Sequence, residues 1–241
     1  MEEHMHILAV HGSPSMKRGK TYLVLERLLK GAEKAGASTE VVFLQEKTIG
    51  GCTGCLSCWI KTPGKCCQKD DMAKLLETLK RTNLMILATP VYVDGMTGLC
   101  KNFIDRLIPL LDPHFEIRGG HSRHVVKEKY CNKIFLVSVC ALSEMDNFDP
   151  LVLHVKRAAI NLNMEYVGEI LRPAVYSVDM KKAGADAIGG ILEAVERAGR
   201  ELVENGVVSE KTQQEVAREV VPKEVYLRTM NRYFDAQIGR G

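Results

Sequence analysis

The feature that most constrains the fold is a repeated alternation of short apolar runs with longer segments of helical periodicity. The runs of strand length are His6–Val10, Thr39–Leu44, Leu84–Ala88, Ile134–Val139 and Glu165–Leu171. The helical segments that follow them are Thr21–Ala35, Asp71–Arg81, Leu99–Leu111, Pro150–Leu162 and Ala183–Glu204. The first, third and fourth runs are almost wholly apolar, as expected for parallel strands covered on both faces. Right-handed crossovers then predict an α/β fold with a doubly wound, five-stranded parallel sheet.

Two segments lie outside this pattern of five strand–helix units. Residues 112–132 form a connection of about 20 residues, and connections of that length are often functional. Residues 207–241 follow the last strand–helix unit, so we predict one domain over residues 1–206 and a helical C-terminal extension over 207–241. A helix beginning near Pro222 would carry one apolar stripe, made of Tyr226, Met230, Tyr233, Phe234 and Ile238. Such a stripe predicts a homodimer or homotetramer, and packing on its own domain is the alternative.

The composition excludes some classes of function. The formal net charge is only +3, which does not favour a nucleic-acid or membrane surface. We find no apolar run of the roughly 20 residues that a membrane span needs, and no secretory signal at the N-terminus, so we expect a cytoplasmic protein. Eight cysteines in a reducing compartment indicate metal binding or redox chemistry rather than disulfides.

The first strand leads into a polar loop that opens a helix. Backbone N–H groups at a helix N-terminus favour a phosphate. The loop residues that can contribute are Ser13, Ser15, Lys17, Gly19, Lys20 and Thr21. A Walker A motif is disfavoured because Pro14 stands where that motif needs its first glycine. An ordinary strand-to-helix turn is the alternative interpretation.

The third strand ends in a second loop at the same edge of the predicted sheet. Ligands of doubly wound sheets bind outside the carboxyl ends of the strands. Backbone groups of this loop could meet the polar edge of a flavin, and Tyr92 could cover part of its ring; simple core packing is the alternative. The loop residues are Pro90, Val91, Tyr92, Val93, Asp94 and Gly95.

Five cysteines gather within residues 50–68. Cys52, Cys55 and Cys58 recur at three-residue spacing, and Cys66 and Cys67 follow. This pattern suits a [4Fe–4S] cluster held by thiolates. A structural zinc site and a loop of free or partly oxidised thiols are the alternatives.

Histidines are concentrated in the long connection. His114, His121 and His124 could bind zinc, but a solvated polar loop is the favoured interpretation, and a contact with a substrate or partner is the other alternative.

Three segments together resemble the NADPH-dependent FMN reductase and iron–sulfur flavoprotein branch of the flavodoxin-like superfamily. They are GSP…GKT at 12–21, CTGCLSCWIKTPGKC…DDM at 52–72 and TPVYVDGMTGLCKNFIDRL at 89–107. The resemblance implies a sheet order of 2-1-3-4-5 with FMN at the carboxyl edge. It implies phosphate contacts from Ser13, Gly19, Lys20 and Thr21, and ring contacts from residues 90–95. It implies further ring contacts after the fourth strand, at Cys140, Ala141 and Glu144.

The resemblance also implies that Cys52, Cys55, Cys58 and Cys66 are the ligands of a [4Fe–4S] cluster, with Cys67 outside it. The sequence departs from the family pattern at Ser15, where arginine is usual, and at Lys20, where asparagine is usual. The segment before Cys66 is also longer than in the compact iron–sulfur flavoproteins.

These observations predict an oxidoreductase that passes electrons from NAD(P)H through FMN to a quinone, nitro-aromatic or similar small acceptor. FMN is expected rather than FAD because no G-x-G-x-x-G dinucleotide motif follows any predicted strand. No catalytic side chain is assigned, since the cofactor carries the chemistry. One alternative is an electron carrier between ferredoxin and an unknown acceptor. The other is a non-enzymatic redox sensor that uses its cysteines.

Overall fold

Five parallel strands form the centre of the computed structural model, which describes residues 5–127, 129–179 and 185–239. The strand order is β2-β1-β3-β6-β7, which confirms the predicted order 2-1-3-4-5. The strands are β1 (His6–His11), β2 (Ser38–Phe43), β3 (Leu84–Pro90), β6 (Lys133–Val139) and β7 (Glu165–Arg172). The three central strands are β1, β3 and β6, and nearly all of their residues are buried, because helices cover both faces of the sheet.

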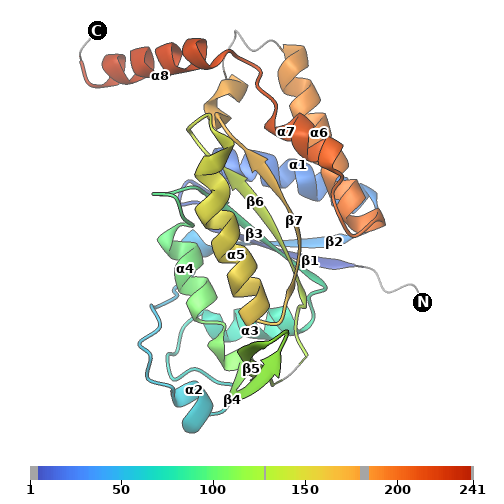
Figure 1. Cartoon of the computed structure of the whole chain (residues 1–241). Helices are drawn as coiled ribbons and strands as arrows, with labels where there is room; N and C mark the ends of the chain where they lie inside the picture. The colour runs from blue at the N-terminus through green and yellow to red at the C-terminus, as the bar shows by residue number, and fades with distance from the viewer. Residues whose placement is uncertain (1–4, 128, 180–184, 240–241) are drawn as a thin grey trace.

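Helices cover the sheet in two layers (Figure 1). On one face α3 (Met72–Lys80), α4 (Gly98–Asp105) and α5 (Asp149–Asn161) enclose one apolar core. On the other face α1 (Lys20–Lys34), α6 (Ala185–Glu204) and α7 (Glu210–Ala217) enclose a second core. The part of the predicted fifth helix at residues 183–184 lies outside the described residues.

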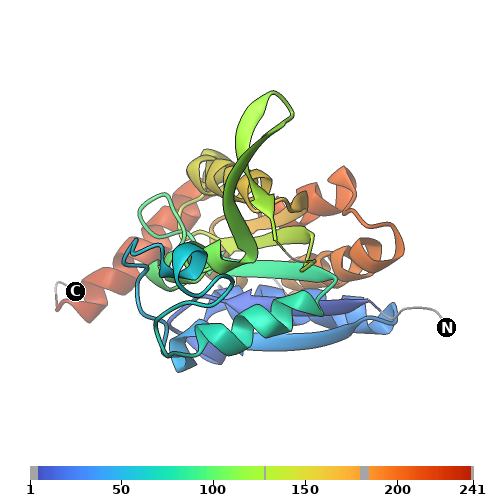
Figure 2. The same cartoon turned by 90° about the horizontal axis from the view of Figure 1, so that it is seen from below.

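The long connection predicted over residues 112–132 is largely ordered as a hairpin. Strands β4 (Leu111–Arg118) and β5 (His121–Val126) pair antiparallel, and the hairpin projects from the body of the molecule (Figure 2). Gly119 and Gly120 form its turn with φ of +58° and +76°, values that favour glycine. This Gly-Gly pair was the sequence signal for a hairpin, and the polar strands around it obscured that signal.

The helix predicted over Leu99–Leu111 is shorter in the structure. It ends at Asp105, and a 3-10 turn at Ile108–Leu110 precedes β4. Pro109 explains the difference, since proline is tolerated in the first turn of a helix but not in its interior.

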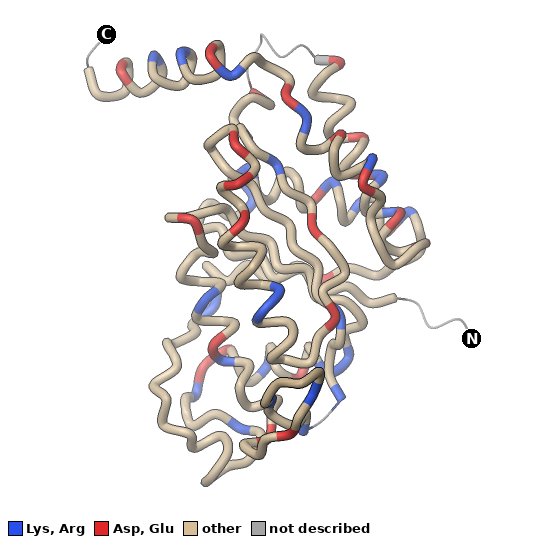
Figure 3. The backbone as a smooth tube through the Cα atoms, in the orientation of Figure 1, with Lys and Arg blue, Asp and Glu red and all other residues tan. Residues whose placement is uncertain are grey.

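The C-terminal extension is helical, as predicted, and consists of α7 and α8 (Lys223–Gln237). The start of α8 packs on the domain through Val221 and Tyr226, while the rest of the helix extends away from the body (Figure 1). Lysine, arginine and acidic residues are interspersed along the helices (Figure 3), which fits the low net charge. None of the described helices is long and apolar enough to cross a membrane.

Candidate functional site

The loop between β1 and α1 is built to leave backbone donors accessible. Gly12 donates its N–H to Ala88 O at 2.8 Å, which fixes the start of the loop against β3. A Cβ at Gly12 would lie 2.0 Å from Cys100 Sγ, so only glycine fits there. Gly19 is the N-cap of α1, and no side chain caps the helix there. The first N–H groups of α1 therefore have no acceptor from an N-cap side chain at the positive end of the helix dipole, which is the arrangement that binds an anion.

The loop after β3 is a tight, strained turn. Tyr92 and Gly95 exchange backbone hydrogen bonds of 2.9 and 3.1 Å. Val93 and Asp94 between them adopt φ of +46° and +60°, a region that is unfavourable for a β-branched residue such as valine. The side chain of Val93 is fully exposed and that of Tyr92 is half-exposed. Strain of this kind concentrates at ligand-binding turns, so the turn is a candidate platform for a ligand.

These two loops meet in a hollow of about 210 Å³, which we call the carboxyl-edge hollow. Of the predicted residues it is lined by Ser13, Ser15, Gly19, Lys20, Thr21, Pro90, Val91, Tyr92 and Ala141. Other residues that sequence reasoning missed also line it, namely Arg18, Val139, Val175 and Tyr176. The structure thus brings together the end of β1, the start of α1 and the turn after β3 at the carboxyl edge of the sheet.

Six predicted residues are not among those that line the hollow. The ammonium group of Lys17 lies 5.9 Å from the centre of the Phe43 ring, and Glu144 forms an ion pair with Lys223 of α8. The others are Val93, Asp94, Gly95 and Cys140, which belong to the turn after β3 or to the end of β6. Their assignment to a cofactor stays a prediction.

The charges at the hollow come from Lys20 and Arg18. Lys20 Nζ lies 2.5 Å from Asp179 Oδ2, so part of its charge is already balanced. Arg18 forms no ion pair with any described residue. A guanidinium is well suited to a phosphate, and Arg18 lies three residues beyond Ser15, where the family pattern has its arginine. No sequence pattern singled out Arg18, because only the fold shows that it faces the hollow.

The cysteine loop is fastened at both ends by Arg106, a residue that sequence reasoning missed. Arg106 is 2% exposed and donates to Asp70 Oδ2 at 2.7 Å and Oδ1 at 2.9 Å. It also donates to Gly50 O at 2.7 Å and Gln68 Oε1 at 3.1 Å. One guanidinium therefore joins residues on both sides of the loop. The indole of Trp59, in the short helix α2 (Ser57–Ile60), donates to Leu111 O at 2.9 Å and links the loop to the hairpin.

Within this loop the thiols share one electrostatic environment. Burial raises the pKa of Cys58, and negative charge on Cys66, Cys52 and Cys55 raises it further. Hydrogen bonds from Ser57 lower the pKa of Cys55 to about 6, which favours a thiolate at neutral pH. Cys55 Sγ lies 3.6 Å from Sγ of Cys67, the residue that the predicted ligand set leaves out.

The donor chemistry suits an iron–sulfur cluster, but the geometry is not preassembled. Among the described residues no group of three or more His, Cys, Asp or Glu side chains is arranged to hold a metal ion. Binding a cluster through Cys52, Cys55, Cys58 and Cys66 would require the loop to rearrange. The described histidines of the hairpin form no such group either: His114 pairs with Asp112 at 2.5 Å, and the ring centres of His124 and Trp59 lie 4.7 Å apart with the rings tilted by 45°.

A doubly wound parallel sheet with an open helix N-terminus after β1 and a strained turn after β3 defines a flavodoxin-like protein. The chain belongs to the NADPH-dependent FMN reductase family, whose sequence model matches residues 5–134, more than half of the chain. An iron–sulfur flavoprotein of Archaeoglobus fulgidus is 37% identical over 130 residues, which cover 54% of this chain and 53% of that one. The chain spans about half the length of the curated relatives that it matches.

Solved structures with low sequence identity share the fold. The NAD(P)H:quinone oxidoreductase from Methanothermobacter marburgensis superposes with a TM-score of 0.62 at 17% identity, covering 83% of this chain and 96% of that one. The FMN-dependent NADH-azoreductase from Bacillus anthracis superposes with a TM-score of 0.61 at 14% identity, covering 83% of this chain and all of that one.

Proposed function

We propose that the protein binds FMN at the carboxyl-edge hollow and acts as an oxidoreductase that takes electrons from NAD(P)H. The observation that carries this proposal is the convergence of the open α1 N-terminus, Arg18 and the strained turn after β3 in one hollow. Membership of the FMN reductase family supports it. When bound, FMN supplies hydride acceptance at its N5 atom and onward electron transfer.

Different residues of the hollow would hold the phosphate and the ring system of the cofactor. The phosphate would meet the first N–H groups of α1, the hydroxyls of Ser13 and Thr21, and the guanidinium of Arg18. The ring system would be held by Pro90, Val91 and Tyr92 and by Ala141, which follows β6. The strained turn would present backbone groups to the polar edge of the ring. A quinone, nitro-aromatic or similar small molecule is the proposed acceptor.

Flavin identification tests the proposal first. Protein purified with its chromophore is denatured, and the released flavin is identified by chromatography; we expect FMN. FAD as the dominant flavin would contradict the proposal, because the phosphate-binding loop has the size for a monophosphate. Oxidation of NADH and NADPH with menadione as acceptor then measures the activity. Arg18→Gln should weaken FMN binding, whereas Lys17→Gln, with the same charge change outside the hollow, should not.

The second candidate is an electron carrier that uses an iron–sulfur cluster and exchanges electrons with ferredoxin. The cysteine pattern and the iron–sulfur flavoproteins among the relatives favour it. Anaerobic iron analysis separates it from the first, since a carrier should hold about four irons per chain besides flavin. Iron loss in Cys66→Ser but not in Cys67→Ser would support the predicted ligand set. The distance of 3.6 Å between the Sγ atoms of Cys67 and Cys55 favours the opposite result, namely iron loss in Cys67→Ser but not in Cys66→Ser. That result would make Cys67, instead of Cys66, the fourth ligand.

The third candidate is a redox sensor without enzymatic activity. The proximity of Cys55 to Cys67 and the lowered pKa of Cys55 are the features that favour it. Purified protein without a flavin or iron chromophore, but with reversible thiol oxidation, would support this candidate over the other two.

A further inference from the structure

A large groove of the described structure lies apart from the carboxyl-edge hollow. It has a volume of about 620 Å³ and is bounded by α4, α5, the β4–β5 hairpin and Cys52 of the cysteine loop. We call it the α4–α5 groove. It shares no lining residue with the carboxyl-edge hollow, so a ligand there would occupy a second site.

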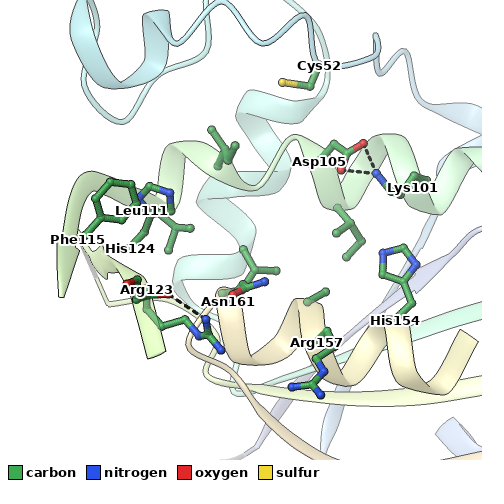
Figure 4. A pocket seen from close by; sticks show the side chains of 15 residues that line it. Cys52, Lys101, Asp105, Leu111, Phe115, Arg123, His124, His154, Arg157 and Asn161 are labelled. Atoms are coloured by element: carbon green, nitrogen blue, oxygen red, sulfur yellow. Dashed lines mark hydrogen bonds and ion pairs between the residues drawn. The ribbon is translucent and has the colours of Figure 1, made fainter. Parts of the chain in front are cut away.

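The base of the groove is apolar. Ile104, Leu111 and Leu162 belong to the buried core and also line the groove, and the exposed ring of Phe115 adds a wall on the hairpin side. Figure 4 shows Phe115 and His124 on the hairpin, opposite His154 and Arg157 on α5. Apolar surface of this kind favours the hydrocarbon or aromatic part of a ligand.

The charged side chains of the groove are mostly positive. Lys101 is neutralised by Asp105, the only acidic residue among those that line the groove, at 2.6 Å. Arg123 and Arg157 have no carboxylate partner among the described residues. The Nε atom of Arg123 is buried without a hydrogen-bond partner, although its Nη1 donates to Ser122 O at 2.9 Å. An unsatisfied buried donor costs free energy that an anionic acceptor would recover.

The two arginines stand at the border of a second hollow of about 540 Å³. That hollow is also lined by Arg118 and His121, and its acidic residue is Glu165, which lies 4.0 Å from Lys133. Figure 4 shows Arg123 extending from the hairpin toward α5, on which Arg157 lies. The apolar groove therefore ends at a cationic boundary.

We propose that the α4–α5 groove binds a small amphipathic anion. Its apolar body would lie on Ile104, Leu111 and Leu162, and its carboxylate or phosphate head would lie at Arg123 and Arg157. A neutral ligand would leave the two guanidinium groups without a counter-charge, and a cation would be repelled. This site does not depend on the proposed flavin chemistry.

The protein contains an intrinsic fluorescence probe for this site. Trp59 is the only tryptophan, and its ring centre lies 4.7 Å from that of His124, which lines the groove. Occupation of the groove should therefore change the emission of Trp59. The same contact would connect the ligand to the cysteine loop, because Trp59 lies between Cys58 and Cys66.

The test is titration calorimetry on the full chain as purified, with octanoate and octyl phosphate as anionic probes and octanamide as the neutral match. We expect saturable binding at one site for at least one anion, with a change in Trp59 emission, and at least tenfold weaker binding of octanamide. A preference between the two anions identifies the head group. Arg123→Gln and Arg157→Gln should each weaken anion binding about tenfold.

Lys156→Gln is the matched control. Lys156 neighbours Arg157 on α5, but its ammonium group lies 5.1 Å from the centre of the Tyr166 ring, and it does not line the groove. This variant should bind the anion as the wild type does. Failure of both anions to bind, equal binding of octanamide, or an equal loss in Lys156→Gln would overturn the proposal. Circular dichroism checks that each variant is folded. Arg157 lies on an exposed helix surface, so Arg157→Gln still tests the proposal if Arg123→Gln does not fold.

Discussion

His11 ends β1 inside the apolar core, directly before the loop that leads into α1. Its ring is fully buried against Phe43 and Tyr22, and neither ring nitrogen has a hydrogen-bond partner among the described residues. Burial lowers the pKa of His11 to about 4. The unfolded chain takes up this proton near pH 6.5, but the folded protein only below about pH 4. Lowering the pH between these values therefore favours unfolding.

We predict that His11→Phe removes this part of the acid sensitivity. Wild-type protein should lose about 2–3 kcal/mol of unfolding free energy through His11 between pH 7 and pH 4.5, and the variant should not. Urea unfolding of both proteins at the two pH values measures the difference. Equal losses in wild type and variant would show that His11 is already protonated in the fold or is exposed.

Arg106 and Asp70 form a buried ion pair at the base of the cysteine loop. Burial acts to raise the pKa of Asp70, but hydrogen bonds from Arg106 and from the Gly50 and Met72 amides outweigh it and lower the pKa. The stability that this carboxylate contributes is thus present at neutral pH and is lost as the pH falls through its lowered pKa.

Removing one partner of this ion pair should lower the free energy of unfolding. Arg106→Met is expected to destabilise the protein by about 3–5 kcal/mol, because it leaves the Asp70 carboxylate buried without a counter-charge. Lys101→Met is the control, since it breaks the ion pair with Asp105 on the same helix, where both side chains are more than 40% exposed, and should cost less than about 1 kcal/mol. Denaturant unfolding compares the two, and similar losses would contradict the structural role assigned to Arg106.

At the scale of elements, the contact between α1 and α6 depends on two glycines. A Cβ at Gly31 would lie 1.8 Å from Glu196 O, and a Cβ at Gly199 would lie 1.9 Å from Leu28 O. The two helix backbones therefore approach more closely than any side chain permits. Neither glycine was singled out by its sequence context, since an isolated glycine in a helical pattern usually signals only lower propensity.

Gly199→Ala should accordingly force the helices apart and cost about 1–3 kcal/mol or more, despite the higher helix propensity of alanine. Gly189→Ala on the same helix is the matched control, because no atom of the described residues lies within 4 Å of its added Cβ. It should be neutral or stabilise by up to about 1 kcal/mol. Thermal unfolding of the two variants gives opposite shifts if the close packing is real, and a rise in melting temperature for both would refute it.

At the scale of the whole molecule, α8 presents an apolar surface that the described part of its own domain does not cover. Tyr226 is buried and donates to Ala141 O, whereas Tyr233, Phe234 and Ile238 are all more than half exposed. The apolar stripe predicted for this helix therefore has two parts. Its first part, at Tyr226, packs on the domain, and its second part, at Tyr233, Phe234 and Ile238, faces solvent. Tyr176 lines both the hollow beside α8 and the carboxyl-edge hollow, so a subunit seated on α8 would lie next to the proposed FMN site.

We predict that a second copy of the chain covers this surface. Phe234→Glu combined with Ile238→Glu should lower the mass in solution, measured by light scattering, to that of a monomer. Arg232→Glu on the same helix changes the net charge by the same amount and should leave the mass unchanged. Deleting Val221–Gly241 is a less selective test, because it also removes Tyr226. An unchanged mass in the double variant would assign the apolar stripe to another role.

The sequence alone determined the five parallel strands of the sheet, both loops of the carboxyl edge and the cysteine loop, whereas the order of the strands was expected from the family resemblance. These features depend on local signals: apolar periodicity, a polar loop that opens a helix, and regular cysteine spacing.

Only the tertiary structure decided which side chains complete each site. Arg18 rather than Lys17 lines the carboxyl-edge hollow, and Tyr176, which follows β7, lines it as well. Arg106 holds the cysteine loop, which begins more than 50 residues earlier in the chain. The α4–α5 groove exists only because a hairpin, two helices and the cysteine loop meet. Such contacts join residues that are far apart in sequence, and packing, rather than any local pattern, determines which of them face one another.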